Sequence, residues 1–78
     1  MKATIFADFH NADARGRLRL NCIGTLEDLA RQGIHLREGL SLLLHDGELE
    51  TEGKVEHSTE EQVWVAAINW NAIRQKTA

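Results

Sequence analysis

Histidines and carboxylates are the side chains of this 78-residue sequence that could bind a metal ion or transfer a proton. Asp8 and His10 share one face of a predicted strand, and Asp13 lies in the loop that follows, so the three could ligate a metal. Their spacing matches no closed metal site, and no residue that would orient the imidazole can be identified. We therefore predict that the two aspartates cap the loop backbone, that His10 faces solvent, and that no metal is bound.

Nucleophiles and phosphate-binding loops give no stronger signal. Cys22, the single cysteine, lies in a predicted apolar strand without an activating group beside it, which is typical of a buried structural thiol. The adjacent carboxylates at positions 27–28 and 60–61 lie side by side on one element and do not face a common substrate. The glycines are isolated and form no phosphate cradle. The sequence therefore predicts no catalytic residue, no cofactor and no enzyme.

Three arginines form a basic stripe. Arg15, Arg17 and Arg19 alternate along the chain, so in a regular strand they share one face and could grip phosphate groups. The alternative is a solvated face whose arginines pair with acidic residues across the sheet. The chain has 12 acidic residues and a net charge of −3, which favours ion pairing and does not favour nucleic acid as a partner.

The same arginines belong to a pair of motifs that resembles the cyclic-di-GMP-binding motifs of the PilZ family, a small six-stranded barrel. Arg15 and Arg19 are spaced as R-x-x-x-R, and Asp28, Ala30 and Gly33 as D-x-A-x-x-G. Alanine stands where the family has serine, and the two motifs are closer together than in the family. The resemblance implies, as an alternative function, a nucleotide- or nucleic-acid-binding small barrel that uses the arginine stripe.

The segment at residues 62–70 is the most apolar predicted strand, and both of its faces are apolar. A core needs only one of them, so the other face packs under another element or is exposed. An exposed pair, Trp64 and Trp70, would be a typical partner-binding anchor. Alternatively, one tryptophan plugs the end of a barrel and the other is covered by Ile73. We name Trp64 and Trp70 as candidate binding residues, with the arginine stripe second.

Alternating polarity and turn residues place the elements that position these side chains. Ile5, Ala7 and Phe9 share one face of the first predicted strand, and Leu18 and Leu20 share one face of the second. Residues 25–32 have the spacing of a short helix, with Thr25 as its cap and Gly33 as its left-handed end. Leu26, Leu29 and Ala30 form a small apolar stripe on it, and so short a helix needs packing to be stable. Asp46-Gly47 predicts a hairpin, and Gly53 a bulge. Strands are predicted at 2–9, 17–23, 40–45, 54–58 and 62–70, and a helical turn capped by Asn71 at 72–74, before a frayed tail from residue 75.

Five short strands in a chain of this length must curl to bury one face, and the usual solutions are small barrels of the SH3 or OB type. The OB fold has its helix between the third and fourth strands, whereas here the helix follows the second. We therefore predict an all-β (mainly β) fold, a five-stranded SH3-like barrel that forms a single domain over residues 1–78. Its last three strands are expected to form a meander.

Composition is in keeping with a packed domain, because 42% of the residues are hydrophobic and 27% are charged. One cysteine forms no internal disulfide, so the core depends on apolar packing or on self-association. No apolar stretch reaches the length of a membrane span, and the start lacks the features of a signal peptide. We expect a cytoplasmic protein without a membrane partner.

Three segments, at residues 34–40, 53–55 and 64–70, resemble small SH3-like barrel proteins of bacteria. In such barrels an apolar-x-x-Gly step precedes a strand, a Gly-x-Val strand follows, and an apolar strand closes the meander. These barrels serve in translation, RNA binding, peptide binding and complex assembly, so the resemblance implies a fold and not one function. We expect a non-catalytic interaction or assembly module that binds a protein partner or itself.

Overall fold

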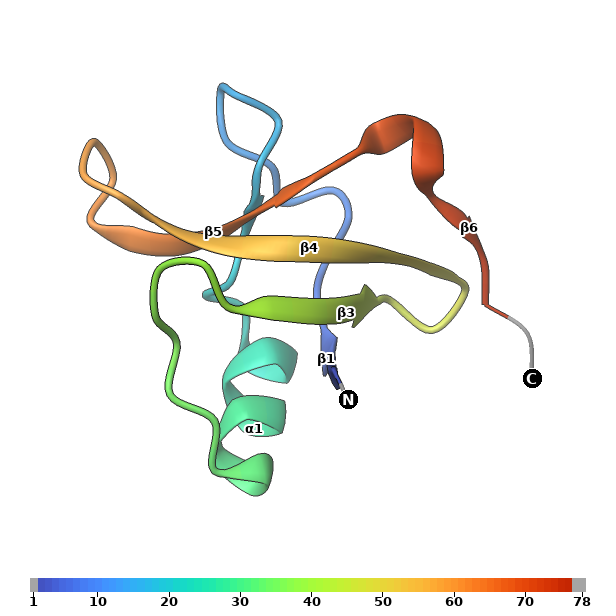
Figure 1. Ribbon diagram of the computed structural model, residues 1–78, viewed down its shortest axis with the longest axis horizontal. Helices are drawn as coiled ribbons and strands as arrows, with labels where there is room; N and C mark the ends of the chain where they lie inside the picture. Colours follow the sequence, from blue (N-terminus) through green and yellow to red (C-terminus); the bar gives the residue numbers. More distant parts are fainter. Residues whose placement is uncertain (1, 77–78) are drawn as a thin grey trace.

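The computed structural model describes residues 2–76, and one mixed sheet dominates it (Figure 1). The strand order is β1-β3-β4-β5-β2, with β6 also paired to β4; β1 is parallel to β3 and the other pairs are antiparallel. The elements in chain order are β1 Ala3–Phe6, β2 Leu18–Arg19, α1 Ile23–Gln32, β3 Ser41–His45, β4 Leu49–Ser58, β5 Val63–Ile68, the 3-10 turn η1 Trp70–Ala72 and β6 Arg74–Gln75.

The predicted meander of the last three main strands is confirmed. Strands β3 and β4 join at the predicted hairpin, where Gly47 has a φ of +100° and the Asp46 carboxylate accepts from the backbone N–H of Leu49 (2.8 Å). Strand β4 is longer than predicted and runs through Gly53 without a bulge, since Gly53 pairs with both Leu42 and Ile68. A Cβ on Gly53 would lie 2.7 Å from Leu44 Cδ1, so glycine is needed here for close packing of the core.

The mainly β prediction is confirmed, but the sheet of the described residues does not close into a barrel. Strands β1 and β2 are its two edges, and the chain between them crosses from one edge to the other. After β1, the Ala7 N–H still donates to the carbonyl of His45 (2.8 Å); further on, Ala12 forms an isolated bridge with Leu18. The SH3-like barrel expected from the sequence is therefore present only as an open, curled sheet.

The core lies on the inner face of this sheet, and its members alternate along the strands as the sequence predicts for β1 and β2. The cluster of buried apolar side chains consists of Ile5, Ala7, Phe9, Leu18, Leu20, Leu29, Leu42, Leu44, Val55 and Ala66. Only one of these residues, Leu29, comes from α1. The helix therefore contributes little apolar packing to the core, and other contacts must hold it in place.

Polar side chains attach α1 to the free edge of β1, and the two elements lie side by side (Figure 1). The Thr25 hydroxyl donates to the Phe6 carbonyl (2.6 Å), and the Phe6 N–H donates to the Asp28 carboxylate (2.8 Å). One turn further on, the Gln32 amide donates to the Thr4 carbonyl (3.0 Å). One face of the helix thus satisfies the backbone groups that a neighbouring strand would otherwise pair.

This attachment corrects two predictions for the helix. Thr25 is not its cap: α1 begins at Ile23 with Cys22 in the N-cap position, because the Thr25 hydroxyl is bonded to β1 instead. The strand predicted at 17–23 consequently ends at Arg19, and Cys22 is half-buried outside any strand. The left-handed end at Gly33, with φ of +66°, is confirmed.

The C-terminal segment also differs from the prediction. The helical turn begins at Trp70 and is capped by Asn69, whose side chain accepts from the backbone N–H of Asn71 (3.0 Å). The chain then pairs again with β4 as the short strand β6, where a frayed tail was expected from residue 75, and Arg74 pairs with Glu50. The return of the chain to β4 is a long-range contact that local sequence patterns do not encode.

Candidate functional site

The arginine stripe lies in a network of ion pairs. Arg17 is 12% exposed, and its guanidinium donates to the carboxylates of Asp13 (2.9 Å) and Glu56 (3.0 Å). Arg19 forms a bidentate ion pair with Glu61, in which its Nε and Nη2 atoms donate to the two carboxylate oxygens at 2.6 and 2.9 Å. Both guanidinium groups are therefore engaged with carboxylates, the arrangement in which arginines pair across the sheet rather than receive a phosphate.

Arg15 lies at the tip of the turn that precedes β2. Its guanidinium is exposed and lies 3.4 Å from a carboxylate oxygen of Glu60. Of the three arginines it is the most exposed, since the side chains of Arg17 and Arg19 are 12% and 28% exposed. A single solvated arginine beside a carboxylate does not form the three-guanidinium grip that the alternation suggested.

Asp13 organises this turn. Its side chain is only 4% exposed; it accepts from the backbone N–H groups of Arg15 (2.9 Å) and Arg17 (2.8 Å), besides the Arg17 guanidinium. Burial opposes ionisation of this carboxyl, but the hydrogen bonds from Arg17 and Arg15 outweigh it and hold the pKa of Asp13 below its usual value. The loop capping predicted for Asp13 is therefore observed.

The second PilZ-like motif lies on α1 and at its end. Asp28 accepts from the Phe6 backbone and pairs with Arg31, and Gly33 terminates the helix. Asp28 is thus part of the attachment of α1 to β1, whereas Arg15 and Arg19 pair with Glu60 and Glu61 in the turn between β4 and β5. The structure does not bring the two motifs together as one ligand site.

The two tryptophans occupy different environments. Trp64 is half-buried, packs against the core cluster, and meets the His57 ring edge-on with the ring centroids 4.9 Å apart. Trp70 is 45% exposed, and its indole N–H donates to the Gly16 carbonyl (2.7 Å), which fastens η1 to the turn before β2. They do not form one exposed pair, because Trp64 packs against the core cluster whereas Trp70 lies at the surface.

The outward face of α1 is the most apolar exposed surface of the helix. Ile23 is 76% exposed and Leu26 is 52% exposed, and Ala30 continues the row at spacing three and four. The apolar stripe predicted on this helix consists of Leu26, Leu29 and Ala30. Leu29 faces inward as predicted, but the prediction is wrong for Leu26 and Ala30, which are exposed. We call Ile23, Leu26 and Ala30 the outer α1 face.

The sequence contains a signal for this orientation. Thr25, Asp28 and Gln32 have the same spacing as the outer α1 face but are displaced by two residues, which is about 200° around a helix. The polar row and the apolar row therefore lie on opposite sides. Because the polar row is bonded to β1, the apolar row must point outward.

The metal and thiol candidates are not assembled into a site. His10 is exposed, and its ring lies 3.7 Å from the Asp8 carboxylate. Cys22 Sγ lies 3.0 Å from the Thr25 hydroxyl. Within residues 2–76 no three His, Cys, Asp or Glu side chains are grouped so that they could hold a metal ion.

Two further aspartates have lowered pKa values. The hydrogen bond that Asp28 accepts from the Phe6 backbone N–H is the main cause of its lowered pKa. For Asp46 the main cause is the hydrogen bond from the Leu49 backbone N–H, and both pKa values fall below the ordinary 3.8. With Asp13, three structural hydrogen-bonding carboxylates are therefore more acidic in the folded protein than in the unfolded chain.

We expect these carboxylates to make stability depend on acid. Groups whose pKa is lower in the folded state stabilise it fully above the unfolded value near 4, and this contribution is lost as the pH falls through the lower folded values. The free energy of unfolding should thus be level from about pH 7 to 5 and decrease below about pH 4. Urea unfolding at a series of pH values measures this, with Asp28→Asn expected to flatten the decrease. A stability that rises from pH 5 to pH 3 would contradict it.

Comparisons with protein-family models, with curated proteins and with solved structures found no match. In the described part of the chain, no helix has the length and apolarity to cross a membrane.

Proposed function

We propose that the protein is a non-catalytic interaction module that binds protein through the outer α1 face, and that the bound partner is a second copy of this chain. The observation that carries the proposal is the exposure of Ile23 (76%) and Leu26 (52%) on a helix whose opposite face is bonded to β1. Exposing two large apolar side chains to water is unfavourable in the monomer. Covering them with a partner removes apolar surface from water and therefore favours association.

The exposure of these residues is enforced by the fold. Rotating α1 to bury them would remove the partners of the Phe6 N–H and carbonyl. Leaving a buried backbone group unpaired costs about 1–3 kcal/mol, which is comparable to the gain from covering one large apolar side chain. The apolar row therefore stays outward, where a partner can reach it.

The spacing of the outer α1 face fits a second copy. In an antiparallel pair of α1 helices, a two-fold axis near residue 27 places Leu26 beside its own symmetry copy and Ile23 beside the partner's Ala30, and the symmetry repeats each contact. Ala30 is small enough for close approach of the two helices. Glu27 and Arg31 are exposed on one flank of this face, and Arg31 pairs with Asp28 of its own chain.

The resemblance to SH3-like barrels supports the module proposal only through the β3–β4–β5 meander. The parallel pairing of β1 with β3 is not part of such a meander. The interaction surface that we propose is therefore a helix face, and not a groove between barrel loops. The alternative of nucleotide binding through the arginine stripe has less support, because Arg17 and Arg19 are already paired with carboxylates.

Sedimentation of the wild type and a double variant tests the proposal. The wild type should dimerise with a dissociation constant of about 100 µM, as expected of a small interface. The variant Ile23→Lys with Leu26→Lys should be monomeric at about 1 mM, with its urea midpoint unchanged, because both side chains are exposed. A control with two lysines at the exposed positions Ala14 and Thr59 should still dimerise. A wild type that is monomeric at about 1 mM, or a double variant that dimerises normally, overturns the proposal.

A further inference from the structure

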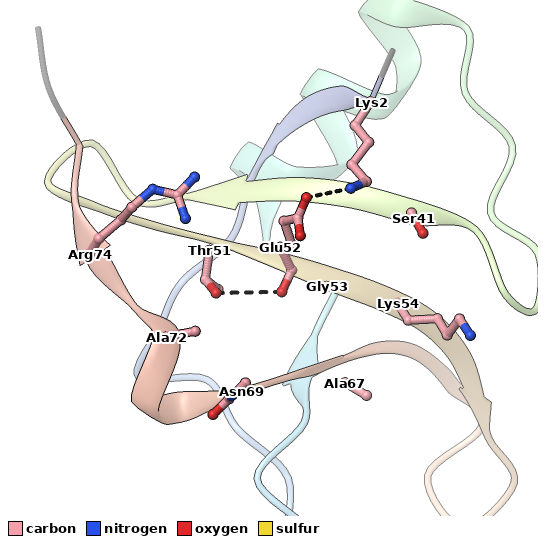
Figure 2. A pocket seen from close by; sticks show the side chains of 10 residues that line it. All are labelled: Lys2, Ser41, Thr51, Glu52, Gly53, Lys54, Ala67, Asn69, Ala72 and Arg74. Atoms are coloured by element: carbon pink, nitrogen blue, oxygen red, sulfur yellow. Dashed lines mark hydrogen bonds and ion pairs between the residues drawn. The ribbon is translucent and has the colours of Figure 1, made fainter.

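A hollow of about 400 Å³ lies on the outer face of the sheet, where the chain leaves β5 as η1 and returns as β6 (Figure 2). The ladder between β5 and β4 ends at the pair of Ile68 with Gly53, and pairing to β4 resumes where Arg74 meets Glu50. The displaced segment between these two pairs forms one wall. The hollow is thus a consequence of the interrupted pairing along β4.

Small side chains on the strands give the hollow its depth. Ser41 pairs with Lys54, and Lys54 pairs with Ala67, so these residues form one row across β3, β4 and β5. Ser41 and Ala67 leave space on either side of the longer Lys54 side chain, and Ala72 on η1 adds another small residue. Their short side chains allow a ligand to approach the sheet closely.

Three cationic side chains and one carboxylate, that of Glu52, line this space, although the chain as a whole carries a net charge of −3. Lys2, Lys54 and Arg74 lie on three sides of it (Figure 2). Lys2 is paired with Glu52, and Arg74 lies 3.7 Å from Glu50. Lys54 is exposed and has no ion pair within residues 2–76.

Neutral hydrogen-bonding groups complete the lining. The Ser41 hydroxyl lies in the row beside Lys54, and the Asn69 amide lies on the wall formed by the displaced segment. Hydroxyl and amide donors, combined with lysine ammonium groups, are the groups that bind phosphate oxygens in proteins. The volume is at the lower end of the range for small-molecule sites.

We propose that this hollow binds a small phosphate monoester, with Lys54 and Ser41 contacting the phosphate. Lys2 would leave its ion pair with Glu52 and pair with the phosphate instead. Arg74 attracts the negatively charged phosphate from the opposite wall. The organic part of the ligand lies over Ala67 and Ala72. This site is separate from the outer α1 face and uses none of Arg15, Arg17 and Arg19. It gives the module a ligand of its own, independent of self-association.

Titration followed by ¹H–¹⁵N NMR tests the proposal, with ribose 5-phosphate as the ligand and with inorganic phosphate and ribose as separate arms. The backbone signals of residues 41, 54, 67 and 69 should shift, with a dissociation constant of about 1 mM or lower for ribose 5-phosphate. Weaker binding of inorganic phosphate at the same signals supports recognition of the ester, and equal binding overturns the role of Ala67 and Ala72. Shifts with ribose alone overturn the role of the phosphate.

Matched lysine variants separate a site from general charge. Lys54→Gln should weaken ribose 5-phosphate binding about tenfold, whereas Lys76→Gln, on an exposed residue outside the hollow, should change it by less than about twofold. Equal weakening by both variants overturns the site. So do shifts confined to residues 15–19, or no shift at about 10 mM ligand.

Discussion

Replacing Asp13 by alanine is expected to lower the free energy of unfolding by about 3 kcal/mol. The carboxylate is 4% exposed and accepts from two backbone N–H groups and the Arg17 guanidinium. Its removal leaves those donors without their acceptor, and the Arg17 side chain is only 12% exposed. Truncating one partner of a covered ion pair costs more than the pair itself contributes, because the remaining charge stays desolvated.

The matched control for this change is Asp13→Asn. Its side-chain oxygen still accepts from the backbone of Arg15 and Arg17, so the change removes the charge and the acceptor of the Arg17 guanidinium but keeps the backbone hydrogen bonds, and we expect about half the effect of alanine. Urea unfolding monitored by tryptophan fluorescence measures both variants. An alanine variant within about 0.5 kcal/mol of the wild type would show that the turn does not depend on this carboxylate.

Thr25→Val is expected to destabilise the protein by about 2 kcal/mol. Valine has nearly the same shape as threonine, so the buried site stays filled, but the hydrogen bond to the Phe6 carbonyl (2.6 Å) is lost. The carbonyl at the covered edge of β1 then lacks its donor. The same change at Thr59, which is exposed on the β4–β5 turn, should alter stability by less than about 0.5 kcal/mol. Equal effects at both positions, measured by urea unfolding, would contradict the role of Thr25 as an edge cap.

Local patterns predict the parts of the fold that local physics determines. The alternation of Ile5, Ala7 and Phe9 gives the inner face of the first segment, and Asp46-Gly47 gives the hairpin. Gly33 ends the helix because only a left-handed residue fits there. Each of these features depends on residues within a few positions of one another, and the structure confirms them.

The orientation of α1 could not be predicted from its apolar spacing alone. Leu26 and Ala30 have the spacing of a buried stripe, and that interpretation assumes a helix that packs on apolar neighbours. Here the helix lies against a strand edge, and backbone groups of Phe6 require hydrogen-bonding side chains. The polar row that supplies them takes the inner position, so the apolar row becomes surface.

The candidate ligand site is likewise a product of long-range pairing. Ser41, Lys54 and Arg74 come from three strands and Lys2 directly precedes β1, and nothing in their sequence spacing connects them. They meet because β1 pairs in parallel with β3 and because the C-terminal segment returns to β4. The arginine stripe shows the opposite case, in which a regular sequence spacing suggests a site that the fold does not form. Acidic residues from distant segments pair with Arg17 and Arg19 and neutralise their charges.

The most direct test of the central claim, that the outer α1 face binds a second copy, is a concentration series of ¹H–¹⁵N NMR spectra of the wild type. Between about 20 µM and 1 mM, we predict shifts confined to residues 22–34 and a Trp70 indole signal that stays constant. That result would place the interface on Ile23, Leu26 and Ala30. Spectra that do not change over this range, or changes centred on Trp70 while α1 stays constant, would contradict the account.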